Sequence, residues 1–128
     1  MSLSDTFGDG AALVEALGSM IRTDGLQDLL AGFNDAGAEE QVQSWQGSIP
    51  NQPVDAGAVK RAVGHGRIDE MAATLGATPD EVAEGLARII PAAVDALTPG
   101  GRLPSGKELD SLDLRDRLSG TDIGSLLR

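Results

Sequence analysis

The chain has 128 residues, a formal net charge of −10 and no cysteine. Its length fits one domain with a single modest core, and the lack of cysteine excludes disulfides, thiol catalysis and thiolate metal sites. Because aromatic residues make up only 2% of the chain, we expect a core of Leu, Ile, Val and Ala, a composition that favours packed helices over sheets.

The negative charge lies in the first four-fifths of the chain. Residues 1–101 hold 15 acidic and 5 basic residues, whereas residues 102–128 hold 5 of each. Because an acidic body repels phosphate backbones, we expect no nucleic-acid binding. The start of the chain lacks the pattern of a signal peptide, and no run of 18 apolar residues occurs, which predicts a cytoplasmic protein without a membrane span.

The first two expected helices are separated by a short polar break. Asp9 is placed to cap a helix over residues 10–22, and Thr23 or Asp24 restarts the chain. The second helix ends at Gly37 and has the i, i+3, i+4, i+7 spacing of one apolar face, carried by Leu26, Leu29, Leu30 and Phe33.

A shorter helix with Val42 and Trp45 is expected next, and Gly47 ends it. Two prolines then predict a loop over residues 47–54. Beyond this loop, Asp55 can cap a short helix, which is broken by Gly64-His65-Gly66. The following helix has its apolar face at Ile68, Met71, Ala72 and Leu75 and ends at Gly76.

Residues 78–81, Thr-Pro-Asp-Glu, form the strongest local signal in the chain, because they combine an N-cap, a first-turn proline and a capping-box Glu. The apolar stripe that follows keeps its helical period across Pro91. A proline inside a helix costs roughly 3 kcal/mol. Pro91 therefore marks either a kink in one helix or the first residue of a second helix. Pro99 belongs to the turn that ends the segment.

The C-terminal segment is predicted to be weakly helical. Ser105 and Glu108 can form a second capping box. Its apolar residues are too few to fold alone, so they pack either on their own domain or on a partner chain. These candidate contact residues are Leu109, Leu112, Leu114, Leu118, Ile123, Leu126 and Leu127.

Short helices with clear stops and no strand alternation predict an all-α fold, a compact bundle of about six to seven helices with a C-terminal tail. Residues 24–104 contain four notable segments, Val42-Gln43-Ser44-Trp45, Pro50-Asn51-Gln52-Pro53-Val54, Ala62-Val63-Gly64 and residues 86–101, Leu-Ala-Arg-Ile-Ile-Pro-Ala-Ala-Val-Asp-Ala-Leu-Thr-Pro-Gly-Gly. In their order and spacing these segments resemble the YidB-like family of small bacterial proteins, a family of uncharacterised function.

The resemblance implies a multi-helical domain over residues 24–104, preceded by an N-terminal helical part at 1–23. The amphipathic tail at 105–128 departs from many members of the family, so its interpretation rests on this sequence alone. The resemblance also implies a structural role for Pro91, as a bend or a helix start. It supplies no catalytic residues.

Residue types that carry chemistry are present, but not in productive patterns. His65 has no sequence neighbour that would make it a catalytic base, so we interpret it as a loop residue. Two acidic groups are explained by helix starts, where negative charge is favoured without any catalytic role. They are the pair Asp69-Glu70 and the set Asp80, Glu81 and Glu84. Residues 34–40 lack the spacing of a calcium loop, and 120–124 lacks the Lys-Ser/Thr of a phosphate loop. We therefore expect no enzyme, no cofactor and no metal site.

Two functions fit these observations. The first is a non-enzymatic protein–protein interaction or self-assembly module that acts through its tail. The second is a binder of a small apolar ligand in the helical core around Trp45. For Trp45 itself, anchoring the core and serving as a contact hot spot both remain open.

Overall fold

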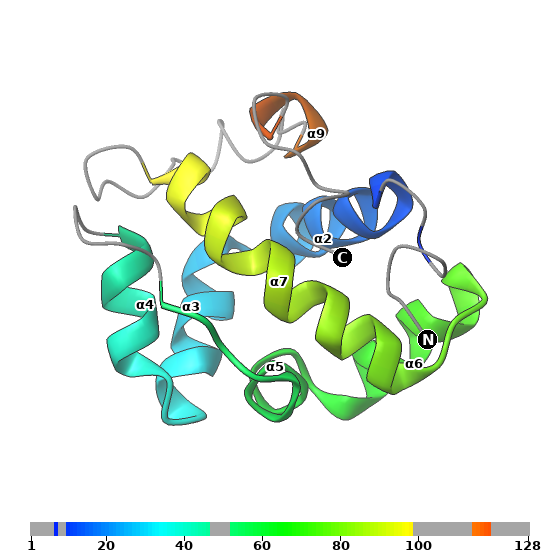
Figure 1. Ribbon diagram of the computed structural model, residues 1–128, viewed down its shortest axis with the longest axis horizontal. Coiled ribbons are helices and arrows are strands. Elements are labelled where there is room, and N and C mark those ends of the chain that lie inside the picture. Colours follow the sequence, from blue (N-terminus) through cyan, green and yellow to red (C-terminus); the bar gives the residue numbers. More distant parts are fainter. Residues whose placement is uncertain (1–6, 8–9, 47–51, 99–113, 119–128) are drawn as a thin grey trace.

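The computed structural model describes residues 7, 10–46, 52–98 and 114–118, and the regular elements in these ranges are helices. The all-α fold predicted from the sequence is confirmed. Figure 1 shows how the helices pack around α7. Their bounds are α2 Ala11–Asp24, α3 Leu26–Asp35, α4 Glu39–Gln46, α5 Ala56–Val63, α6 His65–Leu75, α7 Pro79–Leu97 and α9 Leu114–Arg117.

Helix α7 is the centre of the bundle and contacts α2, α4, α5, α6 and α9. It begins at the predicted capping box. The Thr78 hydroxyl accepts a hydrogen bond from the Glu81 amide at 3.2 Å, and the Glu81 carboxylate accepts one from the Thr78 amide at 3.0 Å. These bonds satisfy two N–H groups that the first turn would otherwise leave without partners.

Pro91 lies inside α7, which continues as one helix to Leu97. The second-helix alternative is therefore excluded. The apolar stripe on both sides of the proline is buried, and Ile89, Ile90 and Val94 are each 0% exposed. Full burial of one such side chain contributes about 1.5–3 kcal/mol. Three of them outweigh the roughly 3 kcal/mol cost of the proline, which explains why the helix does not end there.

Several predicted starts and stops are confirmed. Asp55 caps α5 by accepting a hydrogen bond from the Ala58 amide at 2.7 Å. Gly37 (φ 87°) and Gly76 (φ 68°) adopt the left-handed backbone that L side chains disfavour. The sequence reasoning placed these helix ends well because each depends on one residue and its immediate neighbours.

Other boundaries differ from the predictions. The N-cap of α2 is Gly10 rather than Asp9, and the helix continues past Thr23, whose hydroxyl donates to the Ser19 carbonyl at 2.9 Å. Gly64 alone separates α5 from α6, so His65 begins α6 instead of lying in a loop. A single glycine turns the chain between α2 and α3 (Gly25, φ 90°) and between α5 and α6 (Gly64, φ 103°). No loop is needed at either junction, because glycine readily adopts such a backbone.

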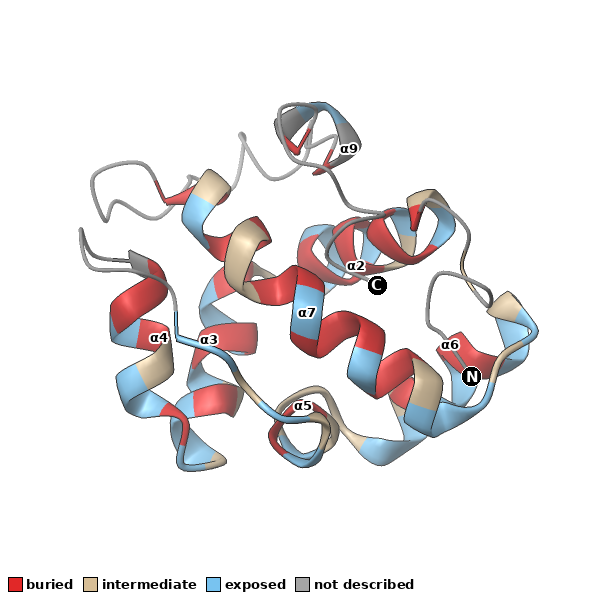
Figure 2. Cartoon of the chain, in the orientation of Figure 1, coloured by how far each residue is buried: buried red, intermediate tan, exposed pale blue. Residues whose placement is uncertain are grey.

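Every helix from α2 to α7 contains buried residues, which are red in Figure 2. Gly32 allows α3 to approach α5 closely, because a Cβ atom there would lie only 2.5 Å from the Ala62 carbonyl oxygen. The core is therefore built by small residues at helix crossings as well as by large apolar side chains.

Candidate functional site

Helix α9 packs over α2 and α7 (Figure 1). Leu114 at its start and Leu118 directly after it belong to the hydrophobic core. Leu114 and Leu118, one helical turn apart, are each 2% exposed, and the Leu118 amide donates to the Leu114 carbonyl at 2.9 Å. A Cβ atom at Gly18 of α2 would lie 3.1 Å from the Leu114 Cβ. The missing side chain at Gly18 therefore makes room for Leu114, and we call this surface of α2 and α7 the α9 groove.

The predicted contact residues of the tail divide into two sets. Leu114 and Leu118 pack on their own chain, so in this arrangement they are covered and offer no surface to a partner. The predicted capping box at Ser105 and Glu108 and the turn residue Pro99 lie outside the described residues. So do the other contact residues, Leu109, Leu112, Ile123, Leu126 and Leu127, whose partner binding stays a prediction.

Trp45 lies in the core, 0% exposed, and its ring meets that of Phe33 edge-on, with centroids 5.3 Å apart and an interplanar angle of 89°. Its indole Nε1 donates to the Gln52 carbonyl at 2.7 Å. The neighbouring Ser44 hydroxyl accepts from the Gln52 amide at 2.9 Å and donates to the Gln41 carbonyl at 2.6 Å. We call Ser44, Trp45 and Gln52 the Gln52 clamp.

The Gln52 clamp gives the Ser-Trp phrase a structural role. It holds both backbone polar groups of one residue against α4 and so fixes where the chain returns after the proline-containing connection. Sequence reasoning identified Trp45 but missed Ser44. The signal available was the placement of a hydroxyl and an indole donor side by side, directly before a segment in which two prolines disfavour a helix.

A partly open cleft of about 170 Å³ lies where four helices end or begin. It is formed by the C-terminal ends of α2 and α5 and the N-terminal ends of α3 and α6. Its lining consists of Met20, Ile21, Gly25, Asp28, Leu29, Ala62, Val63 and Arg67. Trp45 does not contribute to it, so the cleft differs in place from the predicted apolar pocket around the indole.

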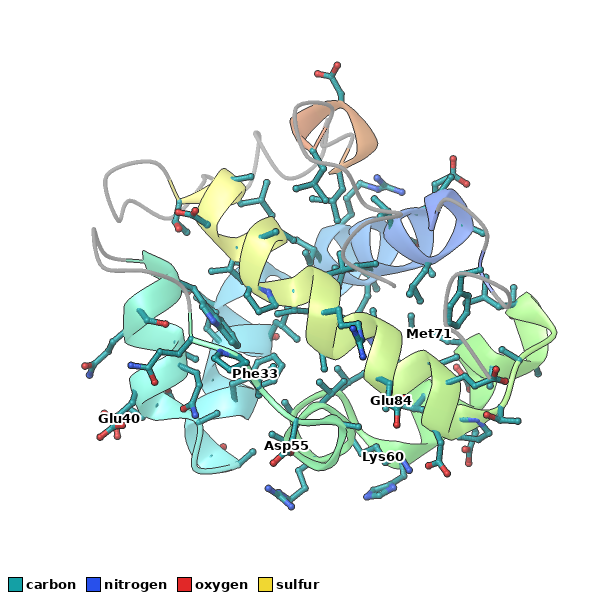
Figure 3. All side chains as sticks on the ribbon, viewed as in Figure 1. Phe33, Glu40, Asp55, Lys60, Met71 and Glu84 are labelled. Atoms are coloured by element: carbon teal, nitrogen blue, oxygen red, sulfur yellow. The ribbon has the colours of Figure 1, made fainter. Side chains whose placement is uncertain are left out.

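Most of the acidic candidates are exposed, and Glu81 is half-buried at the start of α7. Glu40 on α4 and Glu84 on α7 lie far apart in Figure 3 and are both exposed. Asp80 forms an ion pair with Lys60, which joins the start of α7 to α5. His65 is exposed at the start of α6. Within the described ranges, no three His, Cys, Asp or Glu side chains are grouped so that they could hold a metal ion.

None of the helices in the described part of the chain combines the length and apolar character needed to cross a membrane. Comparison with protein families then identifies the domain. The family model for YidB-like proteins matches residues 3–106. The chain belongs to the YidB-like family. The match takes in α2 to α7, and α9 with its two leucines lies beyond the matched region of this YidB-like protein.

A solved structure, described as a homeodomain-like protein of unknown function from Shigella flexneri, is similar to this YidB-like protein with a TM-score of 0.72. The two chains are 24% identical, and the alignment covers 91% of this chain and 92% of the other. At this identity the likeness supports the helical fold alone. The comparison with curated proteins gives no match.

Proposed function

We propose that this YidB-like protein is a non-enzymatic helical interaction module that self-assembles by exchanging α9 between copies. The observation that carries the proposal is the packing of Leu114 and Leu118 in the α9 groove, each 2% exposed. Leu114 in α9 and Leu118 directly after it are one turn apart, and α9 packs against α2 and α7, an arrangement similar to helix-in-groove recognition.

Helix α9 is too short to form by its own helix propensity. It has four residues, whereas an isolated helix in water needs roughly 12–15. Its helical form therefore depends on the groove. A groove on a second copy offers the same contacts, so the energetic difference between binding in one chain and binding between chains is small.

The connection to α7 is long enough for exchange. Residues 98–113 separate the end of α7 from the start of α9. Fully extended, sixteen residues span at most about 55 Å, well beyond the roughly 10–12 Å diameter of a helix with its side chains. Chain length thus permits α9 to reach the groove of a neighbouring molecule.

The negative net charge of the chain favours a protein partner over a nucleic acid. The net charge of −10 disfavours a phosphate backbone, because such binding draws its affinity largely from Lys and Arg. The proposal keeps the cytoplasmic location predicted from the sequence. The alternative, an apolar ligand in the core around Trp45, is less well supported, because Trp45 and Phe33 are both 0% exposed and in contact.

Light scattering of the full chain over a wide concentration range tests the proposal. The expected result is a dimer that forms as concentration rises, and its loss in the double variant Leu114→Ala, Leu118→Ala. Ile68→Ala removes a side chain that is 1% exposed on α6, so it controls for a general loss of stability and should still dimerise. Circular dichroism confirms that each variant is folded. A full chain that stays monomeric at all concentrations contradicts the proposal.

A further inference from the structure

The cleft at the junction of four helices has an apolar wall. Met20 and Leu29 are 8% and 6% exposed, and Ile21 is 1% exposed, so their side chains belong to the core and only their edges face the cleft. Ala62 and Val63 are half-buried and close the wall from α5. An apolar group that enters the cleft would contact the edges of these core side chains and cover the apolar surface that the half-buried Ala62 and Val63 still expose.

The size of the cleft limits its ligand. Its volume is about 170 Å³, whereas sites for drug-sized molecules and cofactors occupy about 300–1,000 Å³. A cavity of about 150 Å³ accommodates benzene. The cleft therefore fits a branched alkyl or thioether group of a few heavy atoms, but not a nucleotide or a flavin.

Two opposite charges flank this wall from different helices. Asp28 is exposed in the first turn of α3, and Arg67 is half-buried in the first turn of α6. Arg67 also interacts within the chain, but a guanidinium has five N–H donors and can bind more than one acceptor. The N-terminal end of α6 favours an anion beside Arg67, whereas the C-terminal ends of α2 and α5, which also line the cleft, favour a cation.

Gly25 also lines the cleft. Gly25 separates α2 from α3 at φ 90°, and its amide donates to the Ile21 carbonyl at 2.8 Å. No protein atom lies within 4 Å of the position where a Cβ would stand at Gly25. The helix junction therefore leaves space beside Asp28 that a larger residue would occupy.

We propose that the cleft binds a small zwitterion with an apolar side chain, the chemistry of a free apolar amino acid. The ligand carboxylate binds Arg67, its ammonium group binds Asp28, and its side chain lies against Met20, Leu29 and Val63. Neither charge of the protein alone selects a zwitterion. Asp28 would repel a ligand that carries only a carboxylate, and Arg67 would repel a ligand that carries only an ammonium group. This inference is independent of the exchange of α9.

Titration of the full-length protein with L-leucine, followed by calorimetry and by backbone amide NMR, tests the proposal. Leucine should bind and shift the amide signals of Gly25 and Arg67. Glycine lacks the apolar side chain, N-acetylleucine lacks the ammonium charge and leucinamide lacks the carboxylate. Each should bind at least about tenfold more weakly, because each lacks one of the three groups of leucine that the cleft contacts.

Two variants locate the site. Arg67→Gln and Asp28→Asn should each weaken leucine binding by about tenfold or more. Arg61→Gln is the matched control, because Arg61 is an exposed arginine on α5 that bonds the Ala36 carbonyl and does not line the cleft, and it should leave binding unchanged. Absence of leucine binding overturns the proposal. So does equal binding of leucine and N-acetylleucine, or binding that both cleft variants leave intact.

Discussion

The indole of Trp45 donates a hydrogen bond to the backbone carbonyl of Gln52, seven residues further along the chain, over 2.7 Å. The adjacent Ser44 accepts the amide of the same residue. Two neighbouring side chains on one helix thus hold both polar groups of a single peptide residue, in the way that a strand partner would. The large ring fills the core, and its polar end fixes the returning chain.

Replacing Trp45 separates these two roles. Trp45→Phe keeps an aromatic ring against Phe33 but leaves the Gln52 carbonyl without its donor, so we expect a loss of about 1–3 kcal/mol in the free energy of unfolding. Trp45→Ala should cost about 3–5 kcal/mol because it also opens a cavity. Urea unfolding measures both values. Equal losses for the two variants would show that the hydrogen bond, and not the ring, carries the effect.

The crossing of α3 and α5 predicts an unusual response at Gly32. An alanine in a helix is usually more stable than glycine by about 0.5–1 kcal/mol. At Gly32 the new Cβ would lie 2.5 Å from the Ala62 carbonyl oxygen, and forcing the two helices apart should reverse the sign. We expect Gly32→Ala to destabilise the fold by about 1–3 kcal/mol.

Gly66 provides the matched control for this prediction. It is also a helical glycine, in α6, but nothing lies within 4 Å of its added Cβ. Gly66→Ala should therefore be neutral or stabilising by up to about 1 kcal/mol. Thermal melting of both variants gives the comparison, and a Gly32→Ala protein as stable as the Gly66→Ala protein would contradict the close packing of α3 on α5.

Pro91→Ala tests why α7 contains a proline. Alanine restores an N–H that can donate to the Ala87 carbonyl and removes a penalty of roughly 3 kcal/mol. Against this, the unfolded chain gains freedom worth about 0.4–1 kcal/mol, and the half-buried ring loses packing. We expect a net stabilisation of about 1 kcal/mol, seen as a higher urea midpoint with unchanged helicity. Lower stability would mean that the packing of the ring outweighs the missing hydrogen bond.

Much of the helical framework follows from local sequence. The capping box of Thr78 and Glu81, the Asp55 cap and the glycines that end α3 and α6 act within a few residues of chain. The apolar period of α7 likewise predicted its buried face. Such features are readable because their energetics involve only neighbours along the chain.

The candidate sites depend on contacts that the sequence does not display. The cleft joins Asp28 and Arg67 from helices separated by two others along the chain, and in the α9 groove the absence of a side chain at Gly18 leaves room for Leu114. The sequence indicated that the tail leucines must pack on something, without indicating which surface. Likewise, Ser44 gained its role only when the chain returned to place Gln52 beside it.

The sequence by itself determined an all-α chain of the YidB-like family, with most of its helix starts and stops, because capping, proline and apolar period are local. Tertiary structure alone decided that α7 continues through Pro91, that Trp45 and Ser44 hold Gln52, and where the cleft and the α9 groove lie. These outcomes depend on burial and on the distance between helices. Both arise only when segments far apart in the sequence pack together.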